Sequence, residues 1–453
     1  MAAMLRRLAY DLVARRDGRR GWQRHRRAFG ALAEVSPREA EARSLDALRR
    51  ILVHAYETVP FYRNAWNAIG FVPSPATTFA DLARLPVVTK DDLRYRRGEM
   101  VSSAYDVRRL DVDLTGGTTG TQTSFYRDRA CTTARFGRQW GILERCGFPP
   151  GERRALIWGA HADLPEHAPA TFKQAFRRYA AGDEVLCCTT LTRADLRAYH
   201  ARLSERTPHV IYGYPNAIEQ FALCVRDEGL SPIRVRRVFC TAERLSDRQR
   251  RLFIDVFGGE VFNLYASREH GVAAFECRRH DALHVDSGSV HVEIVRSGRA
   301  ARPGETGEIV ITDLLNYGMP MIRHATADLA VAGRGVCPCG SPFPWLSRFE
   351  GRVADVLHRP DGSTVAGLML TDLLADHRAI VEAQFVQTDR SSLDVYLVMS
   401  GSGDSLAGVQ HEVARQVRSV VGPELTLRFH HVPSIARNPR SGKYQEVISR
   451  VSA

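Results

Sequence analysis

The spacing of apolar residues along the chain predicts alternating strands and helices over its central part. Leu45, Leu48, Leu52 and Ala55 recur at helical spacing, which predicts an amphipathic helix over residues 39–57. Strand–helix–strand alternation further along is typical of α/β layers built on a parallel sheet. The predicted strands are residues 155–158, 210–212, 238–241 and 261–264, and the predicted helices between them are 192–206, 215–228 and 246–257.

The pattern changes after about residue 285. Residues 290–295 and 308–312 indicate successive strands joined through a turn at 302–304, which predicts a β-rich segment. From residue 356 onward, three strands and two helices indicate a compact α+β unit of ordinary domain size. Those strands are near 383–388, 393–399 and 425–431, and the helices are near 367–376 and 407–420.

These patterns together predict the fold class and the domain boundaries. We expect an α/β protein with a large, multi-layer N-terminal domain of parallel sheet, helices and a β-rich part, and a small, mobile α+β C-terminal domain. The predicted units are a basic N-terminal arm (1–30), the N-terminal domain (31–351), a hinge (352–355) and a C-terminal lid domain (356–453).

Length and composition exclude several classes of protein. The chain has 453 residues, of which 44% are hydrophobic and 25% are charged, so it is neither collagen-like nor wholly disordered. No apolar run approaches the roughly 18 residues that a membrane-spanning helix needs. Nine cysteines without a recognisable export signal favour a reducing, cytoplasmic location.

The formal charge of +12 comes almost entirely from arginine, because only Lys90, Lys173 and Lys443 are lysines. Residues 1–28 alone hold nine arginines against two aspartates. Such an arm can bind nucleic acid or an acidic membrane. No aromatic interleaving or nucleic-acid module follows it, so we expect a solvated arm and no nucleic-acid partner.

A segment rich in threonine and glycine is the first candidate for chemistry. Its backbone is free to curl and to direct N–H groups at a polyphosphate, and its hydroxyls add donors. The Gly-Lys-Ser/Thr ending of a P-loop is absent, and an ordinary surface turn is the alternative interpretation. The residues are Thr115, Gly116, Gly117, Thr118, Thr119, Gly120 and Thr121.

Further motifs follow in an order that narrows the interpretation. They are residues 54–56, 59–62, 85–90, 265–269, 303–308, 316–329, 350–355 and 441–443. In this order and spacing the chain resembles the adenylate-forming superfamily of acyl-CoA synthetases and adenylation domains, and most of all its phenylacetate–CoA ligase and capsule-biosynthesis-type branch. The resemblance covers roughly residues 45–450. It implies ATP-dependent activation of an acid as an acyl adenylate with release of pyrophosphate, followed by transfer to an acceptor.

The resemblance assigns roles around ATP and Mg²⁺. The Thr/Gly segment would hold the β- and γ-phosphates, and Glu269 would hold Mg²⁺, for which a carboxylate oxygen is a suitable ligand. Tyr265 would stack near adenine, and Asp328 would accept hydrogen bonds from the ribose hydroxyls. Further nucleotide-binding positions that the motifs imply are Thr241, Ala242, Glu243, Ala266, Ser267 and Arg352.

Lys443 is the residue to which the resemblance gives the central catalytic role. In the family, a lysine of the C-terminal domain enters the active site and bridges the attacking carboxylate and the α-phosphate. In this lysine-poor chain, a lysine occupies that position within a Ser-Gly-Lys sequence. Lys443 and Glu269 are therefore the expected catalytic residues, and a chance lysine on a loop is the alternative interpretation.

Two segments depart from the family pattern. Where the family has Arg-Tyr-Arg-Thr-Gly-Asp-Leu, residues 323–329 have Ala325 at the second arginine and Ala327 at the glycine. At the inter-domain junction, Ala354 replaces an acid that often serves as the hinge. We therefore expect adenylation to occur and CoA to be a poor acceptor compared with an amine, a carrier thiol or an aryl amine.

Three cysteines and a histidine predict a metal site. Cys277 and His284 are followed about fifty residues later by Cys337 and Cys339. Such a set suits tetrahedral Zn²⁺ with no open position, hence a structural site, and the branch that the chain resembles sometimes carries one. His280 is a competing fourth ligand, and two unrelated turns with free thiols are the alternative interpretation.

The acid-binding pocket is assigned from family position alone. It would be lined by Trp158, His161, Tyr212, Tyr214 and Arg268. This mixture of aromatic and polar side chains favours an aryl or arylalkenyl acid. His161 is equally well explained as an ordinary loop histidine.

Four functions are compatible with these observations. The first is an ATP-dependent ligase that transfers the activated acyl group to CoA, a carrier protein or an amine. The second is a relative that activates nitrite and delivers it to an aryl amine, which gives a diazonium. The third, an inactive nucleotide-binding scaffold, is disfavoured by Glu269, Asp328 and Lys443. The fourth is a nucleic-acid binder, and a homodimer is left open for any of them.

Overall fold

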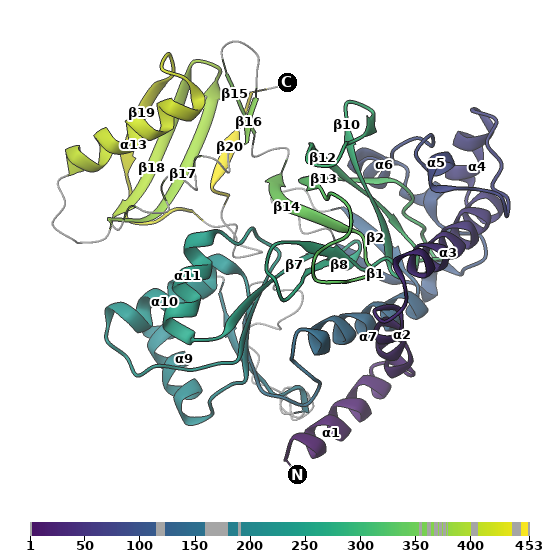
Figure 1. Ribbon diagram of the computed structural model, residues 1–453, viewed down its shortest axis with the longest axis horizontal. Coiled ribbons are helices and arrows are strands. Elements are labelled where there is room, and N and C mark those ends of the chain that lie inside the picture. Colours follow the sequence, from purple (N-terminus) through teal and green to yellow (C-terminus); the bar gives the residue numbers. More distant parts are fainter. Residues whose placement is uncertain are drawn as a thin grey trace.

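A twelve-stranded sheet forms the centre of the larger lobe of the computed structural model (Figure 1). Its strands lie in the order β11-β10-β12-β13-β14-β9-β8-β7-β6-β5-β3-β4. The structure describes residues 2–114, 123–158, 180–188, 192–352, 356–359, 364–366, 370, 374, 377, 379–399, 406–436 and 445–451.

The five strands at one end of this sheet are parallel; four of them were predicted from the sequence pattern, and β4 was not. Short runs rich in β-branched and aromatic residues are buried on both faces in β5 and β6, which is typical of a parallel sheet covered by helices. The strands are β4 (Asp183–Cys187), β3 (Arg154–Trp158), β5 (Val210–Gly213), β6 (Arg237–Thr241) and β7 (Glu260–Ser267).

The remaining strands are antiparallel and continue from β7 in the same sheet. The predicted β-rich segment is confirmed by the pairing of β10 with β12, although these strands extend the central sheet instead of forming a separate one. The strand latest in sequence, β14, lies between β13 and β9. The strands are β8 (Gly271–Glu276), β9 (Leu283–Val285), β10 (Val290–Arg296), β11 (Arg299–Ala300), β12 (Thr306–Asp313), β13 (His324–Ala332) and β14 (Trp345–Arg352).

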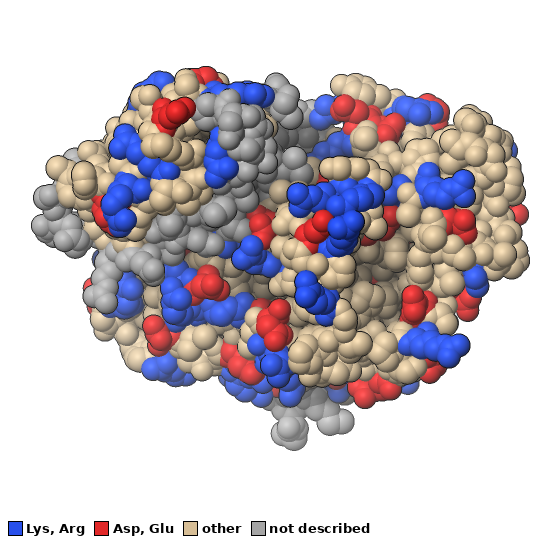
Figure 2. All heavy atoms as spheres, turned by 45° about the horizontal axis from the view of Figure 1, so that its top comes forward, with Lys and Arg blue, Asp and Glu red and all other residues tan. Residues whose placement is uncertain are grey.

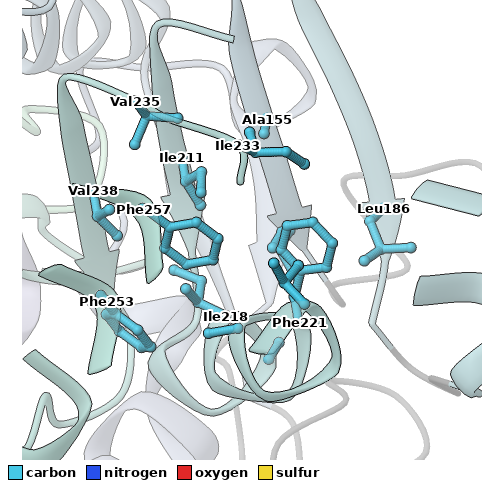
Figure 3. Close-up of a cluster of buried hydrophobic side chains, with 14 of the residues drawn as sticks. Ala155, Leu186, Ile211, Ile218, Phe221, Ile233, Val235, Val238, Phe253 and Phe257 are labelled. Atoms are coloured by element: carbon cyan, nitrogen blue, oxygen red, sulfur yellow. The ribbon is translucent and has the colours of Figure 1, made fainter. Parts of the chain in front are cut away.

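Three helices cover one face of the parallel strands, and all three were predicted. They are α9 (Arg193–Glu205), α10 (Pro215–Asp227) and α11 (Asp247–Phe257). Figure 3 shows Ile211 and Val238 of the strands facing Phe221 and Phe257 of the helices, and all four side chains are fully buried. Capping boxes that begin at Thr192 and Ser246 fix the starts of α9 and α11.

Helices from the beginning of the chain cover the opposite face. These are α1 (Ala2–Arg16), α2 (Trp22–Leu32) and α7 (Arg129–Arg145). The expectation of a solvated arm is wrong for α2, because Trp22 and Phe29 are 2% and 1% exposed in a core shared with α7. The two helices approach closely at Gly141, where a Cβ would lie 2.7 Å from the Phe29 ring.

A helical region between α2 and α7 packs against the antiparallel part of the sheet. The predicted helix over 39–57 is confirmed as the longest of its members. Its side chains form a core with Phe125 and with the segment that contains Met319 and Met321. The elements are α3 (Pro37–Thr58), α4 (Pro60–Asn67), α5 (Phe79–Leu82), α6 (Lys90–Tyr95), the 3₁₀ turns η1 (Arg97–Met100) and η2 (Val107–Arg109), and the two-stranded ribbon of β1 (Asp111–Leu114) and β2 (Ser124–Arg127).

The C-terminal lobe has its own core and its own sheet, in the order β19-β18-β17-β20, separate from the central sheet (Figure 1). A side-chain hydrogen bond from Gln220 Nε2 on α10 to Glu382 Oε1 on β17, 3.0 Å long, joins the two lobes. The predicted helix near 367–376 falls mostly outside the described residues. The elements are β15 (Val356–His358), β16 (Thr364–Ala366), β17 (Ile380–Asp389), β18 (Ser392–Met399), α13 (Leu406–Val421), β19 (Thr426–His431) and β20 (Val447–Ser449).

The surface charge and the composition of the helices bear on binding to nucleic acid and to membranes. On the face seen in Figure 2, basic and acidic side chains are interspersed over both lobes. This mixture does not form the basic stripe that a nucleic-acid groove needs. Among the described helices, none has the length and apolar composition needed to cross a bilayer.

Candidate active site and metal centre

The carboxyl ends of the parallel strands form one edge of the sheet, and most of the predicted site residues lie along it. Trp158 ends β3, Tyr214 follows β5, Thr241 ends β6 and Ser267 ends β7. Neighbouring parallel strands end on the same side, so positions more than one hundred residues apart in sequence become neighbours. In open α/β sheets this edge is where ligands bind.

Tyr265 and Asp328, predicted to lie at the adenine and the ribose, are in direct contact. The Tyr265 hydroxyl donates a 2.7 Å hydrogen bond to Asp328 Oδ2. Burial, and then the adjacent Asp328 carboxylate, raises the pKa of Tyr265 well above its ordinary value, so the hydroxyl stays a donor at neutral pH. Asp328 pairs in register with Arg352 across β13 and β14, which brings a third predicted nucleotide residue to the same place.

Two of the predicted segments contain alanine in left-handed backbone. Ala242, directly after β6, has a φ of 65°, and Ala327, directly before Asp328, has a φ of 61°. A side chain in this region crowds the following carbonyl, which costs roughly 1–2 kcal/mol. At position 327 the family that the chain resembles has glycine. This chain therefore keeps the same backbone conformation with alanine, at the cost of steric strain. Such strain concentrates at functional sites.

Replacing Ala327 with glycine is expected to stabilise the protein by about 1 kcal/mol, because glycine adopts this backbone without steric cost. Urea unfolding of the purified variant would measure the change as a higher midpoint. Ala325→Gly is the matched control, since Ala325 lies in the same strand without a positive φ. It should lower the midpoint. An equal loss of stability in both variants would contradict the strain.

The loop that carries Glu269 is fixed by two arginines that sequence analysis did not identify. Arg135 on α7 is 8% exposed, forms an ion pair with buried Asp313 and donates to the main-chain carbonyls of Arg268 and Glu269. Arg127 at the end of β2 donates to the Arg268 carbonyl over 3.1 Å. The backbone around the half-buried Glu269 is therefore held in place by β2 and α7.

A buried histidine pair lies directly beside Glu269. Nε2 of His270 is 3.0 Å from Nδ1 of His324, so one ring donates and the other accepts. Burial lowers the pKa of His324 to about 4 and that of His270 well below its ordinary value, and both rings are therefore neutral at pH 7. The sequence feature that could have indicated this pair was His324, which stands where the family pattern has tyrosine.

Three of the predicted pocket residues form an aromatic group. The rings of Trp158 and Tyr214 lie 4.6 Å apart, and those of Trp158 and Tyr212 lie 6.1 Å apart. Burial raises the pKa of Tyr212, so its hydroxyl also remains protonated. Arg268, predicted for the same pocket, forms a 3.1 Å ion pair with Asp113 near the end of β1.

Three predicted features lie outside the described residues. These are the Thr/Gly segment 115–121, His161 and the catalytic candidate Lys443. The strands that precede and follow the Thr/Gly segment are described, and they pair as an antiparallel ribbon with Leu114 opposite Ser124. In this described ribbon, Asp113 and Arg127 form an ion pair.

The predicted metal ligands come together from two distant parts of the chain. One ligand atom from each of Cys277, His284, Cys337 and Cys339 lies within 4.8 Å of all the others. Cys277 follows β8, His284 lies on β9, and the other two cysteines lie between β13 and β14. Three sulfurs and one imidazole nitrogen at this spacing fit a tetrahedral Zn²⁺ site.

The hydrogen bonds around the cluster decide which histidine belongs to it. Nδ1 of buried His284 lies 3.3 Å from the Phe343 carbonyl, to which it donates, and Nε2 faces Cys339 Sγ at 3.2 Å. This arrangement leaves Nε2 free to bind a metal. In known metal sites the other ring nitrogen of a ligating histidine commonly donates to a backbone carbonyl in the same way. His280 directs Nδ1 toward Glu276 at 3.4 Å and is not in the cluster. The alternative that His280 is the fourth ligand is therefore wrong.

Comparison with known proteins gives the family. Residues 357–450 match the family described as the CapK C-terminal domain. The phenylacetate–coenzyme A ligase of Escherichia coli K12 is 33% identical over 430 residues, which cover 88% of this chain and 93% of the relative. The chain belongs to the phenylacetate–CoA ligase family. As a member of that branch of the adenylate-forming enzymes, it is an ATP-dependent, AMP-forming ligase that activates an acid.

Other relatives of this family member agree with the assignment. Protein CapK of Staphylococcus aureus is 23% identical over 384 residues, which cover 83% of this chain and 81% of the relative. The fold matches 2-hydroxyisobutyryl-CoA ligase in its postadenylation state with a TM-score of 0.75 and 20% identity, over 92% of this chain and 91% of the other. The same enzyme in its thioesterification state gives a TM-score of 0.60, at 22% identity and the same coverage.

Proposed function

We propose that this ligase activates an aryl carboxylic acid with ATP and transfers the acyl group to an acceptor other than CoA. The observation that carries the aryl substrate is the aromatic group of Trp158, Tyr212 and Tyr214, at the sheet edge that also carries Tyr265. Offset and edge contacts between rings favour a flat aromatic guest over an aliphatic one. The hydroxyls of the two tyrosines would discriminate among ring substituents.

In the proposed first half-reaction, residues 115–121 bind the β- and γ-phosphates, Asp328 accepts from the ribose hydroxyls and Tyr265 lies beside the adenine. Glu269 would hold Mg²⁺, which supplies positive charge against the phosphates. The acid's carboxylate attacks the α-phosphorus, and pyrophosphate leaves. Lys443 would place its ammonium between carboxylate and α-phosphate, where negative charge develops in the transition state. These roles are supported by family membership and by the Tyr265–Asp328 contact.

The cysteine–histidine cluster is proposed to hold a structural zinc ion. Four protein ligands leave no position open for substrate, so the ion would stabilise the fold and take no part in the chemistry. Cys277 and His284 bracket one hairpin, and Cys337 and Cys339 lie in the connection to β14. Zinc would thereby fasten that connection to the hairpin of β8 and β9.

For the second half-reaction we propose that the C-terminal lobe, from about residue 356, rotates about residues 352–355. Lys443 belongs to that lobe, yet it must act at a phosphate segment more than three hundred residues earlier in the sequence. Domain closure supplies a contact that forms for one step and clears for the next. The better match to a postadenylation state is consistent with a lobe placed for the first step. Ala354 replaces the usual hinge acid, which supports the expectation of a poor CoA reaction.

An acceptor series tests the proposed function. We expect pyrophosphate release with ATP and aryl acids in the absence of CoA, less than about twofold stimulation by CoA, and faster turnover with an amine, an aryl amine or a carrier thiol. Turnover that saturates with CoA and exceeds that with every amine would restore an ordinary acyl-CoA ligase. A parallel series with nitrite and aminoaryl acids tests for diazotisation. Pyrophosphate release only with nitrite would contradict an aryl carboxylic acid as the substrate.

A further inference from the structure

The first helix of the chain exposes a row of leucines. In α1, Leu5, Leu8 and Leu12 are 58%, 55% and 64% exposed. Their spacing of three and four residues places them on one face of the helix. Single exposed leucines are ordinary on protein surfaces, but three that share one helical face form a continuous apolar strip, which we call the leucine ridge.

The opposite face of α1 fixes the helix against the rest of the enzyme. Ala14 is 3% exposed in a core with α2 and α7, and Trp140 of α7 donates a 3.0 Å hydrogen bond to the Tyr10 hydroxyl. Nε of Arg6 donates to the Gly151 carbonyl over 2.9 Å. Because these contacts hold the inner face, the leucine ridge points away from the protein. The helix lies at the edge of the larger lobe, on the side away from the C-terminal lobe (Figure 1).

Positive charge accompanies the ridge. The helix carries four arginines and a single aspartate. Two of the arginines, Arg15 and Arg16, are exposed and follow Leu12 by three and four residues, which places them beside the ridge. An arginine can lay its aliphatic stem along apolar surface and keep its guanidinium group in water. An apolar helical face flanked by such residues is typical of helices that lie in the plane of a membrane surface.

The size and the charge of this face favour a membrane over a second copy of the chain. The outer face of α1 is about 22 Å long and about 10 Å wide. A stable protein interface buries roughly 800 Å² on each partner, which is far more than this face offers. Pairing of two ridges would also bring the arginines of both copies together, and like charges repel. An anionic bilayer instead has the opposite charge at its surface and apolar chains beneath it.

We propose that α1 is a peripheral membrane-binding helix that attaches the enzyme to an anionic phospholipid bilayer. The leucine ridge enters the boundary between headgroups and acyl chains, while Arg15 and Arg16 contact the lipid phosphates. Binding is reversible, because three leucines bury little apolar surface. The inference is independent of the proposed acid and acceptor. The expectation of a solvated arm, which came from charge alone, would then be wrong for α1 as well as for α2.

The test measures partitioning of the full-length enzyme into lipid vesicles by sedimentation. One set of vesicles contains phosphatidylcholine with about 30% phosphatidylglycerol, and the other contains phosphatidylcholine alone. We expect partitioning into the anionic vesicles to be at least about tenfold stronger at low salt. It should weaken at high salt, since the attraction of the arginines to the headgroups is screened. Equal partitioning into both kinds of vesicle, or none into either, would overturn the proposal.

A double variant of the ridge is compared with a double variant of other exposed apolar residues. Leu8→Gln combined with Leu12→Gln removes apolar surface, keeps the charge and retains a good helix former at both positions. It should lower partitioning at least about fivefold. The matched control is Ile69→Gln combined with Val72→Gln, whose side chains are 49% and 61% exposed. The control should stay within about twofold of the parent, and an equal loss in both variants would contradict a role for the ridge.

A second variant tests the charge separately. Arg15→Gln combined with Arg16→Gln should lower partitioning about fivefold or more and reduce its dependence on salt. Unfolding temperatures within about 2 °C of the parent would show that both the ridge and the arginine variants remain folded. Full binding by either variant would overturn the proposal. Light scattering without vesicles provides the last check, because a dimer that the ridge variant converts to a monomer would assign the ridge to a second copy instead.

Discussion

Replacing Lys443 with alanine is expected to slow adenylate formation by at least tenfold, and by several decades if the lysine supplies most of the charge at the α-phosphate. Each decade corresponds to about 1.4 kcal/mol of lost transition-state stabilisation. ATP affinity should stay nearly intact, because the proposed contacts with the β- and γ-phosphates come from residues 115–121 and do not involve Lys443. Rapid-quench measurement of acyl-adenylate and pyrophosphate gives the chemical step directly.

Two control variants accompany Lys443→Ala. Arg450→Ala removes an exposed cation from the same lobe, just after β20, and should leave the rate within twofold. Lys443→Arg keeps the charge but replaces a compact ammonium by a planar fork, so it should recover only part of the activity. An unchanged rate of pyrophosphate release in Lys443→Ala would refute the catalytic assignment.

Cys337→Ser is expected to abolish binding of the proposed zinc ion and to lower the free energy of unfolding by about 3 kcal/mol or more. Structural zinc contributes about 10–16 kcal/mol of binding free energy in zinc-finger peptides, and in a larger fold part of that stabilisation is retained by packing. Cys337 is 2% exposed, so its serine would also leave a buried hydroxyl beside Cys277 and Ala282. Metal content per chain and thermal unfolding are the measurements.

Cys146→Ala is the matched control for the zinc variant. Cys146 is also buried, at 3% exposed, but it is not one of the four clustered ligands. It should keep one zinc ion per chain and lose only the stability expected of a small change in the core. The zinc assignment would be contradicted by metal-free protein that was purified without chelator and unfolds at the same temperature as Cys337→Ser.

Most of the parallel strands and their helices could be predicted because each of these segments shows a single pattern, either a short apolar run or a helical periodicity. Short apolar runs such as residues 210–212 have no alternative to burial, and α10 and α11 show plain helical periodicity. The helix α7 could not be found this way, because Arg135 and Arg138 occupy positions on its buried face. Their ion pairs with Asp313 and Asp286 make that burial tolerable, and those partners are more than 140 residues away.

The candidate site also contains some features that the sequence could predict and others that it could not. The clustering of three cysteines and a histidine could be predicted, since these residue types at such spacing have few other uses, but only the hairpin geometry selects His284 over His280. The contact between Tyr265 and Asp328 joins two residues whose roles were assigned separately. Asp113 was missed because a lone aspartate in a short exposed strand has no periodicity or motif. Its ion pairs depend on Arg127 and Arg268, which the fold brings to it.

The position of β14 has a consequence for synthesis on the ribosome. This strand is the last of the central sheet to be translated, yet it lies between β13 and β9. Until residue 352 has left the exit tunnel, both neighbours present open edges with unpaired amides, which are sites for misassociation. The nascent chain must keep this slot vacant while more than three hundred preceding residues are already available to fold. Chaperone dependence would therefore fall on this interval, before the C-terminal lobe has been made.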